Sequence, residues 1–178
     1  MRTSFFVLLL IAVATSAHAQ ALTSGLFVEG AVLGDYDSSR LGKPNPPASV
    51  GGGGTIGFQA GYFTARFEAE VPAFHSGAFS DESFRTITYG AQFGGRFQPY
   101  TRVELAALAG FADTIEERRY SGDGISSRYS YHGGAVTAGV DVAVRVTSHL
   151  SLVPEFRCLV YSEYGSVFRP KLAVRWAF

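Results

Sequence analysis

The sequence predicts an all-β fold: an eight-stranded antiparallel up-and-down transmembrane β-barrel, preceded by a cleavable signal peptide. Three observations predict it. The chain of 178 residues is 47% hydrophobic and 14% aromatic, yet only 17% of its residues are charged, below the roughly one quarter that is usual in soluble domains. Blocks of about ten residues alternate between apolar and polar positions, which is the period of a strand with two unlike faces. Tight turns and longer polar connections alternate between these blocks, as they do in outer-membrane barrels.

The first 19 residues have the three parts of a secretory signal peptide. Arg2 gives a basic start, an apolar run follows at 5–13, and Ala17-His18-Ala19 forms an A-x-A cleavage site before Gln20. The apolar run is only about ten residues long, whereas a membrane-spanning helix needs about twenty. We therefore expect cleavage between Ala19 and Gln20, export through the periplasm, and one mature barrel domain over residues 20–178.

Eight blocks supply the strands of this barrel. They lie at roughly 25–34, 54–63, 65–74, 86–97, 102–112, 136–146, 151–161 and 168–178. The clearest is 136–146, where every second residue from Val136 to Val146 is apolar and Asp141 and Arg145 lie on the opposite face. Block 102–112 is the weakest, because its Ala, Leu and Glu residues also suit a helix. We assign it as a strand because of its neighbours.

The connections between the blocks fall into two groups. Tight turns are expected near 63–64, 98–101 and 147–149. The connections that alternate with them are 35–53, 75–85 and 113–132, which are longer, and 162–166, which is short. Short periplasmic turns and longer extracellular loops are typical of outer-membrane barrels. A soluble sandwich or a lipocalin-type barrel has no reason to sort its loops in this way.

The bulky face of each strand is expected to point outward into lipid. The interior of an eight-stranded barrel is only just wide enough to be filled by side chains. It cannot hold the large aromatic residues of the apolar faces, which are Phe67, Tyr89, Phe93, Phe111, Phe156, Phe168, Trp176 and Phe178. Closure of the barrel leaves no unpaired backbone edge in the hydrocarbon, where each exposed group would cost several kcal/mol. Aromatic residues near block ends, among them Tyr62, Tyr100 and Tyr161, suit a girdle at the lipid–water boundary.

The opposite face carries charged residues of both signs, which this register directs into the lumen. Buried charges need partners, and arginine offers carboxylates a planar fork that lysine does not. We therefore expect an ion-paired, plugged lumen in preference to an open pore; the alternative is that these charges are solvated surface groups. The expected lumen network consists of Glu29, Arg66, Glu68, Glu70, Arg96, Arg102, Glu104, Asp141, Arg145, Glu155, Arg157, Arg169, Lys171 and Arg175.

The last five residues, Val174-Arg175-Trp176-Ala177-Phe178, end on an aromatic residue preceded by alternate apolar positions. This segment resembles the carboxy-terminal assembly signal of bacterial outer-membrane β-barrels. With the glycine-rich strand start at 51–57, the mature chain resembles the small eight-stranded OmpA-like or opacity-like barrel family throughout. The resemblance implies residence in a bacterial outer membrane among lipids and lipopolysaccharide, and recognition of Val174, Trp176 and Phe178 by the barrel assembly machinery. The chain lacks the peptidoglycan-binding domain of two-domain members, so a cell-wall anchoring role is not implied.

The sequence gives little support for a catalytic or metal-binding site. His149 and Ser151 give a His-x-Ser pair with Glu155 nearby, similar to the motif of lipid A deacylases, but the pair falls in a tight turn at the periplasmic end, away from the outer leaflet. His75 and His132 lack a suitably placed nucleophile, and they could bind a metal only if two loops converged. We therefore expect no catalytic, cofactor-binding or metal-binding residue and no cofactor.

Composition excludes several of the remaining functional classes. The single cysteine, Cys158, excludes an internal disulfide and a multi-cysteine zinc site, and it reads as a small apolar residue on the lipid face. A formal net charge of zero argues against nucleic-acid binding. We expect a structural or surface-interacting protein whose unknown ligand would bind at loops 35–53 and 113–132; the second loop is rich in Tyr, Ser, Gly and Arg, a composition common in adaptable binding surfaces. The alternatives are a narrow solute pore and, less favoured, a lipid-modifying enzyme.

Overall fold

The computed structural model describes residues 24–37, 48–72, 75–76, 82–122, 125–162 and 165–178. The strands are β1 (Gly25–Asp37), β2 (Ala48–Ala60), β3 (Phe63–Pro72), β4 (His75–Ser76), β5 (Glu82–Tyr100), β6 (Val103–Gly122), β7 (Ile125–Arg145), β8 (Leu150–Tyr161) and β9 (Gly165–Ala177). Within these residues no helix is long and apolar enough to cross a membrane. The expected signal peptide lies outside the described residues.

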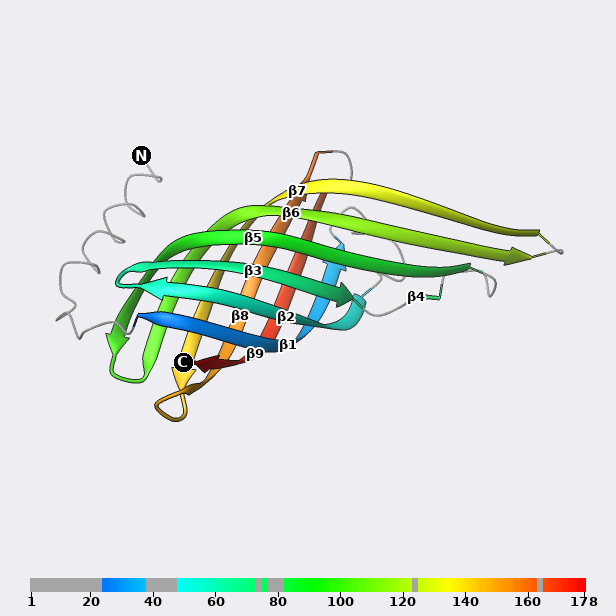
Figure 1. The fold of residues 1–178 in the computed structure, drawn as a ribbon. Helices are drawn as coiled ribbons and strands as arrows, with labels where there is room; N and C mark the ends of the chain where they lie inside the picture. The colour runs from blue at the N-terminus through cyan, green and yellow to red at the C-terminus, as the bar shows by residue number, and fades with distance from the viewer. Residues whose placement is uncertain (1–23, 38–47, 73–74, 77–81, 123–124, 163–164) are drawn as a thin grey trace.

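The eight long strands form one closed antiparallel barrel (Figure 1). Neighbours along the chain pair with each other, β3 pairs directly with β5, and β1 pairs with β9, which joins the first strand to the last. The two-residue strand β4 lies outside this ring and pairs only with β5, at Phe84 and Ser83. The predicted fold class, an eight-stranded up-and-down barrel, is therefore confirmed.

The tight turns gather at one end of the barrel, which we call the periplasmic end. The β2–β3 turn lies at Gly61-Tyr62, two residues before the expected position, and Gly61 has a φ of 53°. Glycine suits this left-handed conformation because it has no Cβ atom. The β7–β8 turn is closed by the amide of Val146, which donates to the carbonyl oxygen of Leu150 at 2.8 Å.

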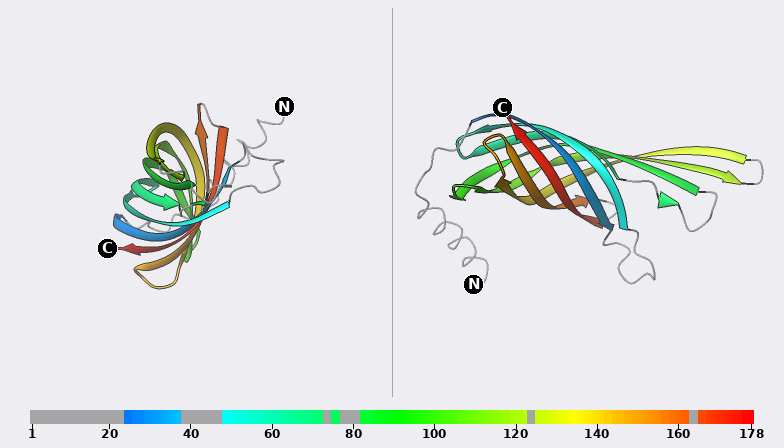
Figure 2. Two further views of the ribbon diagram at one scale, coloured as in Figure 1. Left: turned by 90° about the vertical axis from the view of Figure 1, so that its right-hand side faces the viewer. Right: turned by 90° about the horizontal axis from the view of Figure 1, so that it is seen from below.

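The opposite, extracellular end differs from the prediction. Residues 113–132, expected to form a long loop, continue β6 and β7 as a hairpin whose pairing runs unbroken from Val103–Val144 to Gly122–Ile125. Figure 2 shows β5, β6 and β7 projecting together beyond the rest of the barrel. Apolar alternation stops here, whereas backbone pairing continues. We call the part of β5–β7 beyond Asp113 the extracellular extension.

Inside the barrel, small apolar clusters lie on either side of a charged middle. Ala112, Ala135 and Leu159 pack together toward the extracellular end. Ala143, Val153 and Ala173 pack together toward the periplasmic end. Charged residues lie between these clusters, and Arg175 and Glu29 lie one inward row beyond the periplasmic one.

Candidate functional site: the lumen network and the extracellular extension

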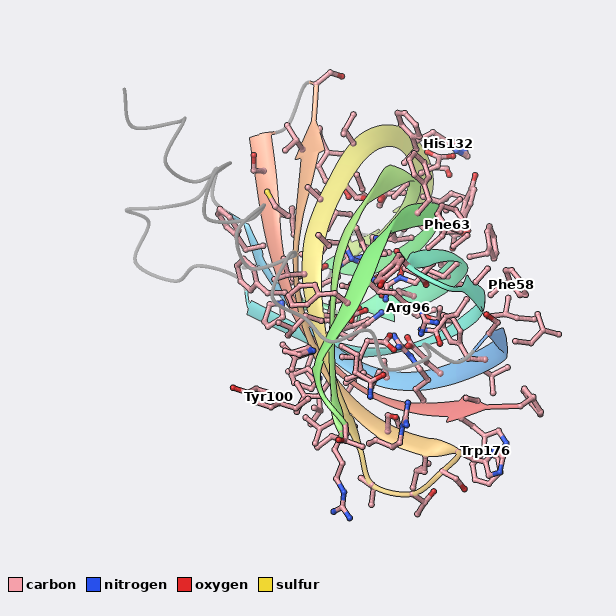
Figure 3. All side chains as sticks on the ribbon, turned by 90° about the vertical axis from the view of Figure 1, so that its left-hand side faces the viewer. Phe58, Phe63, Arg96, Tyr100, His132 and Trp176 are labelled. Atoms are coloured by element: carbon pink, nitrogen blue, oxygen red, sulfur yellow. The ribbon has the colours of Figure 1, made fainter. Side chains whose placement is uncertain are left out.

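The outer surface of the barrel is apolar. Side chains on alternate positions of every long strand are exposed, and they are mostly Val, Leu, Ile and Phe. Figure 3 shows Phe58, Tyr100 and Trp176 projecting away from the barrel, whereas Arg96 points into it. Cys158 lies on the same outward face, between Arg157 and Leu159, which are fully buried. The predicted orientation, with apolar side chains outward and arginines inward, is the one observed.

At the extracellular end of the lumen, three cations from β8 and β9 face carboxylates of β1, β3 and β8. Arg157 forms a forked ion pair with Glu68, and its Nη2 lies 3.0 Å from Glu70 Oε1. Arg169 links the other oxygen of Glu70, at 2.6 Å, to Asp35 on β1. In this layer Arg169 therefore joins two carboxylates, and Arg157 joins three, because it also contacts Glu155 at 3.0 Å.

The middle of the lumen is crossed by Arg66 of β3. Its Nη2 lies 2.5 Å from Glu155 Oε1 and its Nη1 lies 3.2 Å from Asp141 Oδ2. The amide oxygen of Gln92 accepts from the same guanidinium at 2.6 Å, and the Gln92 amide nitrogen donates to Glu68 at 3.0 Å. Gln92 thus connects the middle of the network to its extracellular layer.

Toward the periplasmic end, Arg175 and Arg96 share a carboxylate. Arg175 contacts Glu29 at 2.6 Å, Asp141 at 3.3 Å and Glu104 at 3.5 Å. Arg96 contacts the other oxygen of Glu104 at 2.7 Å and donates from Nε to the carbonyl oxygen of Gly61 at 2.8 Å. A continuous chain of polar contacts therefore runs from Asp35 at one end of the lumen to the β2–β3 turn at the other.

Twelve of the fourteen residues expected in the lumen are buried there; the two others are not. Arg102 is exposed in the β5–β6 turn because β5 ends at Tyr100 and β6 begins only at Val103, so strand alternation does not apply to it. Arg145 is half-buried at the last position of β7, at the periplasmic mouth. The placement of these two residues in the buried network is thus wrong. The lumen network is defined here by what the structure brings together: Glu29, Asp35, Arg66, Glu68, Glu70, Arg96, Glu104, Asp141, Glu155, Arg157, Arg169, Lys171 and Arg175.

Four residues that matter inside the barrel were not assigned to the network from the sequence. Asp35 was placed in a loop, although β1 extends to Asp37. Gln59 and Gln92 carry no charge and so are absent from the predicted network, yet Gln59 donates to Glu104 at 2.9 Å. Phe27 is buried under the guanidinium of Arg175, which lies 4.6 Å from the ring centroid. For Phe27 the signal was available, because Glu29 two positions later shares its face of the strand.

One aromatic residue departs from the expected girdle. Tyr161 points into the barrel, packs against the cluster formed by Ala112, Ala135 and Leu159, and has its hydroxyl 2.8 Å from the Thr114 hydroxyl. Its neighbours Leu159 and Arg157 are inward as well, so strand alternation required this orientation. Tyr62, Tyr100 and Trp176 are exposed at the periplasmic end, where a girdle would lie.

The residues of the His-x-Ser motif are not arranged as a catalytic group. The His149 Nδ1 atom lies 3.0 Å from the carbonyl oxygen of Ala177, and its ring stacks on Trp176 with the centroids 5.7 Å apart. Glu155, which would orient the histidine in such a motif, is instead buried against Arg66 and other cations. Among the described residues, no three His, Cys, Asp or Glu side chains are arranged to hold a metal ion. The side chain of His75 lies outside the described residues.

A polar row crosses the outer face where the extracellular extension begins. The Tyr89 hydroxyl donates to Asp113 Oδ2 at 2.5 Å, and His132 Nδ1 lies 3.9 Å from the same oxygen. Phe111 and Val136, one row closer to the periplasmic end, are exposed apolar residues. The apolar surface on β5–β7 therefore gives way to polar groups at Asp113.

Within the described residues, the longest open edge of the extracellular extension belongs to β7. Its first edge belongs to β5, where β4 pairs with Phe84 and Ser83. Its other edge belongs to β7, and there the last partner on β8 is Tyr161, opposite Ala135. Within the described residues, positions 125–134 of β7 pair with β6 alone. This open stretch covers ten residues, or about 33 Å at 3.3 Å per residue.

The architecture defines a class of protein: a closed barrel that has an apolar outer face and a polar interior, and that crosses a membrane with strands. The chain matches the family model "Outer membrane protein beta-barrel domain" over residues 5–166. It therefore belongs to the outer-membrane β-barrel family and resides in a bacterial outer membrane. A search of curated protein sequences finds no significant match to the chain.

Solved structures share this fold at low sequence identity. A major outer membrane protein of Thermus thermophilus is 14% identical with a TM-score of 0.67, over 88% of this chain and 100% of that one. The N-terminal barrel of Pseudomonas aeruginosa OprF is 14% identical with a TM-score of 0.63, over 88% and 100%. Ail of Yersinia pestis, solved in complex with the heparin analogue sucrose octasulfate, is 11% identical with a TM-score of 0.62, over 87% and 97%.

Proposed function

We propose that this protein is a non-enzymatic surface-interaction protein that binds an extracellular protein segment along the open edge of β7. The observation that carries the proposal is the run of ten residues, 125–134, that project beyond the barrel and, among the residues that the structure describes, pair on one side only. An unpaired strand edge is a template for adding another strand. In that mode, main-chain hydrogen bonds provide affinity and alternate side chains provide specificity.

The register shows which backbone groups face the open edge. The amide of Arg145 donates to Arg102 on the β6 side, and the amide of Val146 faces Leu150 on the β8 side. The pairing of β7 continues without a register shift, so even-numbered residues point their backbone groups toward the β8 side throughout. Beyond the barrel these groups belong to Ser126, Arg128, Ser130 and His132, and they are available to an incoming strand.

A substitution at Ser130 tests this proposal selectively. Ser130→Pro removes an edge-facing amide without removing a bond to β6, because proline lacks the N–H group. Ser130→Ala keeps the amide and is the matched control. Cells producing each variant are compared for adherence to two coatings, whole-serum protein and extracellular-matrix extract, together with a variant in which residues 114–131 are replaced by Asn-Gly. We expect adherence to at least one coating with wild type and Ser130→Ala, and its loss with the other two. Equal adherence of all four, or adherence no greater than that of cells lacking the protein, would contradict the proposal.

A second candidate is binding of a sulfated glycan at the tip of the extension. In the β6–β7 register Arg119 lies opposite Arg128, and like charges directly opposite each other are unfavourable without a compensating partner. Ail was solved with a heparin analogue, which makes heparin a suitable probe. Salt-dependent heparin binding that is lost in Arg119→Gln/Arg128→Gln and retained in Ser130→Pro would favour this candidate over strand addition.

We infer that the lumen does not conduct solutes. The support is the lumen network, in which six cations and seven carboxylates occupy the interior at contact distances. Planar-bilayer recordings of the refolded protein are expected to show no stable single-channel steps, and such steps would favour the pore alternative. Lipid A from cells with and without the protein is expected to have the same mass; loss or gain of one acyl chain would favour a lipid-modifying enzyme.

For export and assembly, we propose that residues 1–19 are a signal peptide cleaved between Ala19 and Gln20, and that Val174, Trp176 and Phe178 are read by the barrel assembly machinery. The support is that Val174 and Trp176 point outward on β9 and that Phe178, which directly follows this strand, is exposed. Mass spectrometry of the purified protein tests the cleavage position. Phe178→Ala is expected to lower the amount of folded barrel in outer membranes, and unchanged amounts would contradict the assembly role.

A further inference from the structure

A cavity opens at the periplasmic mouth of the barrel, beyond the lumen network. Its volume is about 240 Å³, and Arg102, Arg145, Arg175, Glu104 and Ser151 are among its lining residues. We propose that this mouth cavity binds a phosphoryl group, either of a small phosphorylated solute of the periplasm or of an anionic phospholipid headgroup at the inner leaflet. This site is separate from the extracellular extension, and its test is independent of the surface-interaction proposal.

Two arginines and a serine lie side by side on the inward face at this mouth. Arg145 on β7 is the register partner of Ser151 on β8, and Ser151 is the register partner of Arg175 on β9. Directly opposite residues of antiparallel strands lie about 4.5–5.5 Å apart. The Ser151 hydroxyl is therefore flanked by two guanidinium-bearing positions. Arg102 lines the same cavity, and its carbonyl oxygen accepts from the Arg145 amide at 2.8 Å.

The charges at the cavity are not balanced. Its charged lining side chains are those of three arginines and Glu104. Glu104 is already engaged by Arg96 at 2.7 Å, Gln59 at 2.9 Å and Arg175 at 3.5 Å. Within the part of the chain that the structure describes, neither Arg102 nor Arg145 has a carboxylate within ion-pair distance. The mouth therefore carries an excess of positive charge at the border between the buried network and water.

The lining chemistry and the size select the ligand. Guanidinium groups bind phosphate through paired, charge-assisted hydrogen bonds, and the serine hydroxyl can donate a further one. The cavity is smaller than the roughly 300–1,000 Å³ of sites for drug-sized ligands. It therefore suits a phosphate or a glycerophosphate unit and is too small to enclose a nucleotide.

The protein contains a built-in reporter of this site. Trp176 is its only tryptophan, and its ring stacks on His149, which lines the cavity. Occupation of the cavity next to His149 is expected to alter the tryptophan fluorescence. The refolded barrel in phosphatidylcholine vesicles is titrated with inorganic phosphate and with glycerol 3-phosphate, with chloride at equal ionic strength as the reference. In a second arm, the vesicles contain increasing phosphatidylglycerol and no added phosphate.

The variants are Arg145→Gln, Arg145→Lys and, at the opposite end of the barrel, Arg85→Gln as the matched control. We expect a saturable fluorescence change with phosphate, with phosphatidylglycerol, or with both; which arm responds identifies the source of the phosphoryl group. Arg145→Gln should weaken the apparent affinity about tenfold or more, the loss expected for a charge-assisted hydrogen bond. Arg145→Lys should recover part of it, and Arg85→Gln should not change it.

Three results would overturn the proposal. They are the absence of a saturable response in both arms, a response to chloride equal to that to phosphate, and an affinity that Arg145→Gln leaves unchanged. Heat-dependent gel mobility shows whether each variant is folded. Because Arg145 has no ion pair among the described residues, its loss should leave the barrel intact.

Discussion

Replacing Arg157 by methionine should destabilise the barrel by about 3–5 kcal/mol, the cost of leaving a buried charge without its partner. Arg157 is fully buried and donates hydrogen bonds to Glu68, Glu70 and Glu155. Charge-assisted hydrogen bonds of about 1.5–3 kcal/mol each would sum to a larger loss if every acceptor were left alone. Two acceptors are not left alone, however, because Glu155 keeps Arg66 and Glu70 keeps its second arginine.

Glu68 is the carboxylate that loses its main partner. After the substitution it retains the Gln92 amide at 3.0 Å and a lysine ammonium at 3.6 Å. The net cost is therefore close to that of one uncompensated buried carboxylate. Neutralising it in the double variant Arg157→Met/Glu68→Gln should recover at least about 1.5 kcal/mol, since contacting residues in one network are not additive.

The assay is reversible urea unfolding in phosphatidylcholine vesicles, followed by the fluorescence of Trp176. Arg102→Met is the matched control, because Arg102 is exposed in a turn and surface substitutions usually change stability by less than about 0.5 kcal/mol. A change below about 1 kcal/mol for Arg157→Met would refute the reasoning. So would a double variant no more stable than the single one.

Three further predictions use the same assay. Gly57→Ala should lower the free energy of unfolding by about 1–3 kcal/mol, because a Cβ atom there would lie 2.1 Å from the ring of Phe27. In a Phe27→Leu background the same substitution should cost less. Equal losses of stability in both backgrounds would contradict the contact. Val140→Arg, on the lipid face midway along the part of β7 that pairs with β8, should cost about 2–4 kcal/mol, whereas Ser130→Arg in the extension should cost little. Equal effects would argue against a membrane boundary at the start of the extension. Asp35→Asn should cost only about 1 kcal/mol, because its arginine partner keeps a second carboxylate, and a loss above about 3 kcal/mol would show that this outermost pair is essential.

The sequence predicts the barrel well because one physical constraint acts on every strand. Lipid outside and a narrow polar interior force strict alternation, so Val140 and Asp141 can be assigned to opposite faces without coordinates. The prediction fails where that constraint ends. Arg102 fits the alternation of block 102–112 in the sequence, but it lies in a turn, where successive residues no longer face opposite sides.

The extracellular extension was missed for the same reason. Past Asp113 the sheet projects beyond the barrel, and lipid no longer imposes apolar alternation on it, so the apolar period that marks a strand disappears while the backbone pairing persists. Asp35 was missed because it lies beyond the last apolar residue of its block, although β1 continues. The partners within the lumen could not be predicted either: Arg66 bonds to residues 26, 75 and 89 positions away, and such pairings depend on barrel closure and side-chain length.

The junction between the first and last strands has a consequence for biogenesis. Along β1 and β9, backbone pairing is reinforced from within by the contacts of Arg175 with Glu29 and of Arg169 with Asp35. In an eight-stranded sheet that has not yet closed, these arginines lie on one edge strand, β9, and these two carboxylates lie on the other edge strand, β1. During insertion, intermediates in which β1 and β9 are not yet paired should therefore hold these arginines apart from their β1 carboxylates. Only the final pairing of β1 with β9 brings the opposite charges together.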